Sequence, residues 1–168
     1  MTMVTETDVA TTQVYRVYIK ATPQAVWDAI TKPEWSERYG YGGRVRYDLR
    51  PGGEYRAYAS EEMRAHGAPD LAIDGEVLEA DPPRRLVQTF RMLMDPGLEA
   101  EGFTRLTYEI EPVEGGVAKL TVVHELEGAP RLGRLLAGEF ESEGAGGGWA
   151  WVLSDLKTLL ESGSRLAG

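Results

Sequence analysis

The chain has 168 residues, of which 27 are acidic and 18 basic, so its formal net charge is −9. This length suits one domain, since single hydrophobic cores commonly serve about 100 to 200 residues. The acidic balance, without a block of lysine or arginine, argues against nucleic acid and anionic membranes as partners. The absence of cysteine excludes disulfides and thiolate chemistry.

We expect no targeting signal in the N-terminal region. Residues 1–12 lack the basic start and the apolar run of a signal peptide, and we expect them to form a disordered tail. No apolar run elsewhere is long enough to cross a bilayer. We therefore expect a soluble cytoplasmic protein with one domain at 13–163 and a short C-terminal tail at 164–168.

The first expected elements are a strand and two short helices. Residues 13–20 alternate between apolar and polar side chains, which predicts a half-buried strand. Thr22 and Pro23 supply an N-cap and a first helical residue, so a helix should begin there and carry Trp27 inward. The same start signal around Pro33 predicts a second short helix.

Six further strands are predicted, because two-residue alternation recurs between turn signals. They fall at 44–49, 54–59, 71–80, 86–94, 104–111 and 117–126. The first two should form a hairpin, while 60–70 and 95–102 are expected to be loops. Gly75 is expected to relieve crowding or to permit a bend.

The last expected element is an amphipathic helix within 147–163. Its apolar side chains recur every 3.6 residues on one stripe, formed by Trp149, Val152, Leu153, Leu156, Leu159 and Leu160. The opposite side carries Ser154, Asp155, Lys157, Thr158 and Glu161. One helix cannot bury such a stripe alone, so we expect it to pack on the concave face of the sheet.

Four motifs follow one another along residues 13–162. They are the run from Ala21 to Ile30, Pro51-Gly-Gly-Glu-Tyr55, the stretch from Gly75 to Pro83, and Gly147-Gly-Trp149 with Leu153 and Leu156. Their order resembles the START-like superfamily, also called the SRPBCC group, in the branch named after the activator of the heat-shock-protein-90 ATPase. The resemblance implies an α+β helix-grip fold, in which a curved antiparallel sheet of about seven strands surrounds a long C-terminal helix and a deep cavity lies between them.

The same resemblance leaves the activity open. Members of this superfamily bind lipids, polyketides and other hydrophobic molecules, and some relatives are cyclases or dehydratases. The name of the branch adds a third alternative, a chaperone-associated regulator. The family thus implies the fold more narrowly than the function.

Motifs for nucleotide or metal chemistry are incomplete. The glycine run at 144–148 is followed by Trp149 instead of Lys-Ser or Lys-Thr, so it makes no P-loop, and no nucleophile elbow occurs. Two histidines far apart in the sequence, without cysteine, are a poor set of metal ligands. The sequence therefore predicts neither a metal nor another cofactor.

Strand alternation and the helical stripe direct a mostly apolar set of side chains into the expected cavity. The set consists of Trp27, Tyr47, Tyr55, Gln88, Phe90, Met92, Tyr108, Leu120, His124, Trp149, Leu153 and Leu156. This lining favours reversible binding of a small hydrophobic molecule, lipid-, polyketide- or aromatic-like.

His124 is the only catalytic candidate, and it is a weak one. An imidazole facing the cavity could act as a general base in a cyclase or dehydratase. The alternative is a structural histidine held by Tyr108 or by a backbone carbonyl, and this alternative is favoured.

Two remaining features suggest an interface and a lid. Trp151 falls outside the apolar stripe, so it is either a lone exposed aromatic residue or an anchor in a homodimer. Residues 130–141 have the spacing of a short amphipathic helix, and four glycines lie within 142–148. We interpret 130–141 either as a lid over the cavity mouth, hinged at 142–148, or as a connector packed on the surface.

Overall fold

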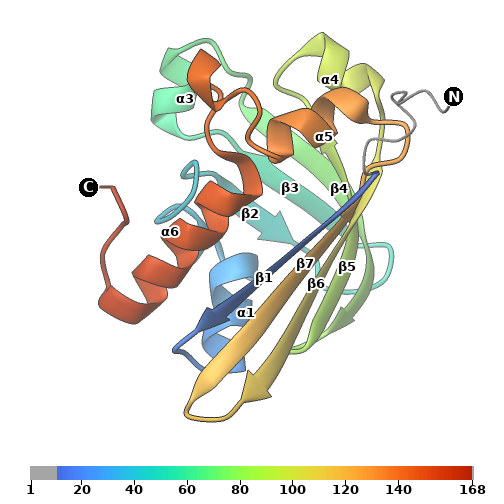
Figure 1. Cartoon of the computed structure of the whole chain (residues 1–168). Helices are drawn as coiled ribbons and strands as arrows, with labels where there is room; N and C mark the ends of the chain where they lie inside the picture. Colours follow the sequence, from blue (N-terminus) through green and yellow to red (C-terminus); the bar gives the residue numbers. More distant parts are fainter. Residues whose placement is uncertain (1–10, 168) are drawn as a thin grey trace, which may run out of the picture.

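The computed structural model describes residues 11–167 and shows one seven-stranded antiparallel sheet with helices on its concave face (Figure 1). The expected tail at 1–12 lies outside the described residues, apart from its last two. The strands are β1 (Thr12–Ile19), β2 (Arg44–Tyr47), β3 (Glu54–Tyr58), β4 (Leu71–Asp81), β5 (Arg85–Met92), β6 (Thr104–Val113) and β7 (Val117–Glu125).

The helices are α1 (Pro23–Thr31), α2 (Pro33–Ser36), α3 (Glu61–Ala65), α4 (Pro96–Ala100), α5 (Pro130–Leu136) and α6 (Gly148–Ser162), with a 3-10 turn η2 (Glu141–Glu143). Two of them, α3 and α4, occupy stretches that we expected to be loops. Each has an N-cap that the sequence analysis passed over, since Ser60 accepts from the Met63 amide and Asp95 accepts from the Gly97 amide.

The strand order in the sheet is β1-β7-β6-β5-β4-β3-β2, so β1 and β2 form its two edges. Apart from β1, which pairs with β7, each strand lies beside the strand that follows it in the sequence. Two register shifts, at Ala57/Tyr58 and between Val77 and Glu79, interrupt the pairing of β4 with its neighbours. Such irregularities bend strands and raise their twist. Gly75 lies between them, and a Cβ there would collide with the carbonyl of Thr89, which confirms the expected crowding.

The long helix α6 packs across the concave face of the sheet, with α1 beside it, as a helix-grip fold requires (Figure 1). Helices α3 and α5 gather with the N-terminal end of α6 at the end of the sheet away from α1. Fully buried Leu86 of β5, Leu106 of β6 and Leu120 of β7 belong to the same hydrophobic core cluster as Leu156 of α6. The predicted apolar stripe of α6 therefore has the partner that the sequence analysis assigned to it.

Asp155 corrects the predicted polar side of α6, because its side chain is completely buried. Its carboxylate accepts from the backbone amides of Gly40 and Leu166, each at 2.8 Å, and from Arg165 at 3.1 Å. Burial raises the pKa of Asp155, but these three donors outweigh burial, so the pKa lies below its usual value.

The expected C-terminal tail is held to the domain through the same carboxylate. Arg165 also donates to the carbonyl of Gly40 at 2.7 Å, so the segment after α6 joins the loop between α2 and β2. Trp151, predicted to be outside the stripe, is half-buried. No helix within residues 11–167 is long and apolar enough to span a membrane.

Candidate ligand-binding cavity

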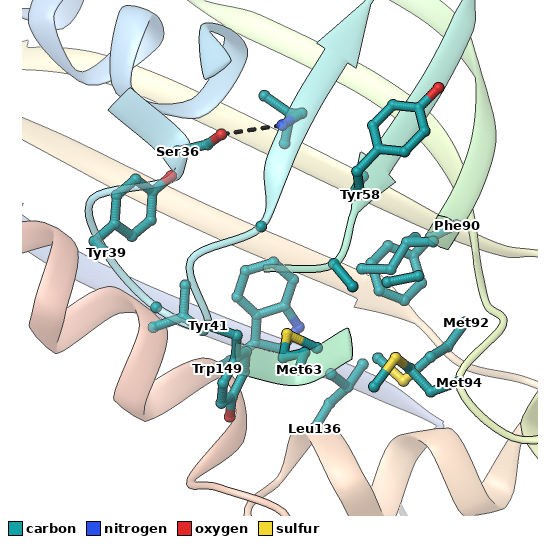
Figure 2. A pocket seen from close by; sticks show the side chains of 18 of the residues that line it. Ser36, Tyr39, Tyr41, Tyr58, Met63, Phe90, Met92, Met94, Leu136 and Trp149 are labelled. Carbon is teal, nitrogen blue, oxygen red and sulfur yellow. Dashed lines mark hydrogen bonds between the residues drawn. The ribbon is translucent and has the colours of Figure 1, made fainter. Parts of the chain in front are cut away.

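A cavity of about 190 Å³ lies between β3 to β6, the loop before β2, and the N-terminal end of α6 (Figure 2). Helix α3 and helix α5 each contribute a side chain to its wall. The lining consists of Ser36, Tyr39, Gly40, Tyr41, Gly43, Val45, Tyr55, Ala57, Tyr58, Ala59, Met63, Ala72, Ile73, Phe90, Met92, Met94, Tyr108, Leu136, Gly148, Trp149 and Val152.

The chemistry of this wall is apolar and adaptable. Among residues 11–167, no charged side chain lines the cavity. Three methionines contribute to it, namely Met63, Met92 and Met94, which Figure 2 shows around the same pocket as Trp149 and Leu136. Flexible thioether side chains adjust to the shape of a ligand more readily than branched ones.

A cluster of tyrosines supplies most of the polar groups. Desolvation raises the pKa values of Tyr39, Tyr47, Tyr55 and Tyr108, so each phenol is neutral at physiological pH. Tyr47 lies behind the wall, where its ring stacks on Tyr55 with centroids 4.7 Å apart and its hydroxyl donates to the Gln88 carboxamide. The cluster therefore offers neutral hydrogen-bonding groups and no charge.

His124 belongs to a buried hydrogen-bond chain. The indole Nε1 of Trp149 donates to His124 Nδ1 at 3.2 Å, so Nδ1 holds the lone pair and Nε2 holds the proton. Nε2 then donates to Thr104 Oγ1 at 2.7 Å, and the Thr104 hydroxyl donates to the carbonyl of Phe90 at 3.1 Å. Both ring nitrogens are engaged, with neither partner that the sequence analysis named.

The consequence is a structural role for this imidazole. His124 is completely inaccessible, and burial lowers its pKa from 6.5 to about 4. A neutral ring without an accessible nitrogen cannot take a proton from a molecule in the cavity. What it does is fix the orientation of Trp149, which forms part of the cavity wall.

The structure brings five of the sequence-predicted side chains into the lining, namely Tyr55, Phe90, Met92, Tyr108 and Trp149. It places the other seven behind that lining, namely Trp27, Tyr47, Gln88, Leu120, His124, Leu153 and Leu156. Six of these seven are buried at 6% exposure or less, because helices α1 and α6 fill that part of the concave face, while Tyr47 remains partly accessible. Side chains on the same face of the sheet therefore do not all line the cavity.

Several lining residues were missed by the sequence analysis. Tyr39 and Tyr41 lie in a glycine-rich loop without periodicity, so no pattern indicated where their rings point. Met63 lies on α3, which was expected to be a loop, although the N-cap signal at Ser60 could have indicated that helix. Met94 falls just beyond β5 on the predicted inward face.

Helix α5 covers one side of the cavity through Leu136, but it ends earlier than the predicted 130–141. Its N-terminal end is anchored, because the Glu101 carboxylate accepts from the amides of Arg131 and Leu132, each at 2.9 Å. Gln13 Nε2 also donates to the carbonyl of Gly133 at 2.7 Å. These contacts hold α5 to the rest of the molecule on the side away from the glycine run.

The glycine run itself is a site of close approach. Gly146 has φ 82° and Gly148 has φ 70°, and a Cβ on either would collide with neighbouring atoms, those of Tyr41 and of the Leu136 carbonyl respectively. The hydroxyl of Tyr41 accepts from the Gly148 amide at 3.1 Å. The glycines are therefore required where the chain turns into α6 beside Tyr41.

The fold was compared with known structures, and several are similar along most of their length. An Aha1 dimer from Colwellia psychrerythraea is 18% identical, with a TM-score of 0.61, and the match covers 90% of this chain and 97% of that one. An HSP90 activator from Plasmodium falciparum is 17% identical, with a TM-score of 0.61 and coverage of 90% and 96%.

A third similar structure is CalU16 from Micromonospora echinospora, which is 20% identical with a TM-score of 0.62 and coverage of 94% and 69%. At these identities the likeness concerns the fold alone. The comparison with curated proteins found no match. The family model described as Activator of Hsp90 ATPase homolog 1-like protein matches residues 20–161, so the chain belongs to this family.

Proposed function

We propose that this protein reversibly binds a small, largely apolar molecule in the cavity between the sheet and α6. The observation that carries the proposal is a concave, uncharged wall of methionine, aromatic and small aliphatic residues with a few neutral hydroxyl groups. Ligand sites in proteins commonly combine such an apolar wall with few polar groups that orient the ligand.

A cavity-filling substitution tests this proposal directly. Ala57 lies in the wall, whereas Ala150 is exposed on α6. Ala57→Leu is expected to abolish binding by occupying the space, while Ala150→Leu should leave binding unchanged. Native mass spectrometry of gently purified protein would show the bound molecule in the parent and in Ala150→Leu. Retention of the same molecule by folded Ala57→Leu would contradict the proposal.

The enzyme alternative, a cyclase or dehydratase, requires a general base in the cavity. The buried, fully hydrogen-bonded His124 does not favour that role, and no carboxylate lines the wall within the described residues. Chemical conversion of the bound molecule that is lost in folded His124→Gln would favour the enzyme. A chaperone-associated role rests on family membership, and a stable complex with a heat-shock-protein-90 chaperone would support it.

We also infer that Trp151 contributes to a homodimer interface. The residue is half-buried on α6, outside the predicted stripe, and one similar structure is described as a dimer. Large aromatic side chains are frequent anchors of interfaces. Sedimentation should show self-association that Trp151→Ser weakens, and a monomer at high concentration in both proteins would contradict this inference.

A further inference from the structure

We propose that the cavity selects a neutral, ring-sized molecule with an acceptor oxygen, such as an aryl ketone, and that the hydroxyl of Tyr108 donates to this oxygen. This inference rests on the proposed function, ligand binding in the same cavity. It adds a chemical class and names the residue that recognises it. Three features of the wall lead to it: its charge, its free donor and its size.

The first feature is the lack of charge. Among residues 11–167 the wall contains no arginine, lysine or histidine that could pair with a carboxylate, and no acidic side chain that could pair with an amine. Placing an unpaired ion in such a site carries a large desolvation cost. The net charge of −9 adds unfavourable long-range repulsion for an anion. A neutral ligand avoids both costs.

The second feature is the hydroxyl of Tyr108. The residue lies on β6, facing inward between Leu86 of β5 and Val122 of β7, and its ring meets Trp149 edge-on with centroids 6.1 Å apart. Although it lies deep in the molecule, its side chain is still partly accessible, and it lines the cavity. The structure gives its hydroxyl no hydrogen-bond partner among residues 11–167.

That hydroxyl must therefore reach open space. Within the described chain, every fully buried side-chain oxygen or nitrogen has a hydrogen-bond partner. An oxygen without a partner on a residue that lines the cavity is thus an accessible one, and the accessible space beside Tyr108 is the cavity. A phenol in this position is a ready donor for a carbonyl or ether oxygen.

Two of the neighbouring phenols are already engaged in hydrogen bonds. Tyr39 donates to the carbonyl of Ala29 at 2.9 Å, and Tyr41 accepts from the Gly148 amide. The hydroxyl of Tyr55 has no hydrogen-bond partner among residues 11–167 either, and its ring stacks on that of Tyr47. The hydroxyl of Tyr58 points away from Met63 and Trp149 (Figure 2). Tyr108 is therefore a free donor in the cavity wall, and its ring lies next to that of Trp149.

The third feature is size. A cavity of about 190 Å³ is comparable to the engineered cavity of about 150 Å³ that accepts benzene. One ring with a short substituent fills such a space, and the aromatic and methionine side chains provide favourable contacts with its faces and edges. An aryl methyl ketone satisfies the size, the neutrality and the donor together.

Three probes of nearly equal size and shape test the proposal: acetophenone, its alkene isostere α-methylstyrene, and benzoate. Titrations of the methionine methyl signals by NMR would give the dissociation constant of each. We expect Tyr108→Phe to weaken acetophenone binding by about three- to tenfold and to change α-methylstyrene binding by less than about twofold. Benzoate should bind about tenfold more weakly than acetophenone, or worse.

The control is Tyr18→Phe, which removes an exposed phenol outside the cavity and should change nothing. Unchanged α-methylstyrene binding shows that Tyr108→Phe keeps its cavity. Equal losses for acetophenone and α-methylstyrene would overturn the role of Tyr108, and benzoate binding as tightly as acetophenone would overturn the selection of neutral ligands. If none of the three probes perturbs the methionine signals, the proposed binding function itself fails, which is a separate outcome.

Discussion

The concave side of the sheet has two halves that differ in how they are filled. Where β5, β6 and β7 face α1 and α6, large aliphatic side chains such as Leu86, Leu106 and Leu120 are completely buried. Where β3 and β4 border the cavity, the small side chains of Ala57 and Ala72 contribute to the wall beside larger ones, and space remains. One continuous sheet thus supports both a packed core and a hollow.

The difference shows that side-chain volume, more than strand pattern, decides where the sheet borders a packed core and where it borders a cavity. Each fully buried leucine contributes about 1.5 to 3 kcal/mol to folding by leaving water. The alanines of β3 and β4 contribute less, but they leave the space that a ligand needs.

The largest effect is expected in the filled half. Leu120→Ala should lower the free energy of unfolding by about 3 kcal/mol, because close-packed neighbours cannot collapse into the space that it leaves. Met92→Ala, in the cavity wall, should cost about 1 kcal/mol, since the side chain is partly accessible and borders existing space. Urea unfolding of both variants measures the difference, and equal losses would show that the two halves are packed alike.

The buried hydrogen-bond chain from Trp149 through His124 to Thr104 should make the stability of the fold depend on pH. The unfolded imidazole has a pKa near 6.5, whereas burial lowers the folded pKa to about 4. Below pH 6.5 the unfolded state therefore binds a proton that the folded state does not. The contribution of His124 to the free energy of unfolding is therefore fully present above pH 6.5. The free energy of unfolding should fall by up to about 3 kcal/mol between pH 6.5 and 4.

Two histidine variants isolate this effect. His124→Gln should lose the part of the pH dependence between 6.5 and 4, measured by urea unfolding across that range. His66→Gln removes the exposed histidine next to α3 and should retain it. An unchanged profile in His124→Gln would show that other groups cause the acid sensitivity.

Asp155 connects the loop between α2 and β2 to the segment after α6. Removing its carboxylate should have an intermediate effect on the free energy of unfolding. Asp155→Ala leaves the amides of Gly40 and Leu166 without their acceptor, which should cost about 2 kcal/mol at neutral pH. Because its pKa is lowered by folding, this contribution is present above the unfolded value near 3.9 and is lost as pH falls through the folded value.

The matched control is Asp70→Ala, whose carboxylate is 84% exposed and should contribute within about 0.5 kcal/mol. Thermal unfolding of the two variants at neutral pH compares a buried carboxylate with an exposed one. Similar losses would mean that the C-terminal segment adds nothing to the fold.

The smallest effect concerns entry into the open half. If α5 acts as a lid, the anchor at Glu101 opposes its opening, so Glu101→Ala should raise hydrogen exchange of residues 130–136 by about fivefold. Exchange in β7 should not change. Protection of 130–148 equal to that of β7 in the parent protein would show that α5 is a connector and not a lid.

The sequence by itself determined the number of strands, their order along the chain, their inward faces and the apolar stripe of α6. These features depend on local alternation and on short-range turn signals. It also indicated the family, through motifs that hold their order along the chain. The boundaries agreed within a few residues, while α3 and α4 were missed because their N-cap signals at Ser60 and Asp95 were not weighed.

Only the tertiary structure decided which inward residues meet a cavity and which are packed against helices. Tyr55 and Tyr47 face the same side, but one lines the cavity and the other lies behind it, because the strands curve and other elements cover them. Asp155 shows the same dependence, since its buried carboxylate is paired with the amide of Gly40, which is distant in sequence. Long-range packing sets these environments, and a local pattern of residues does not contain it.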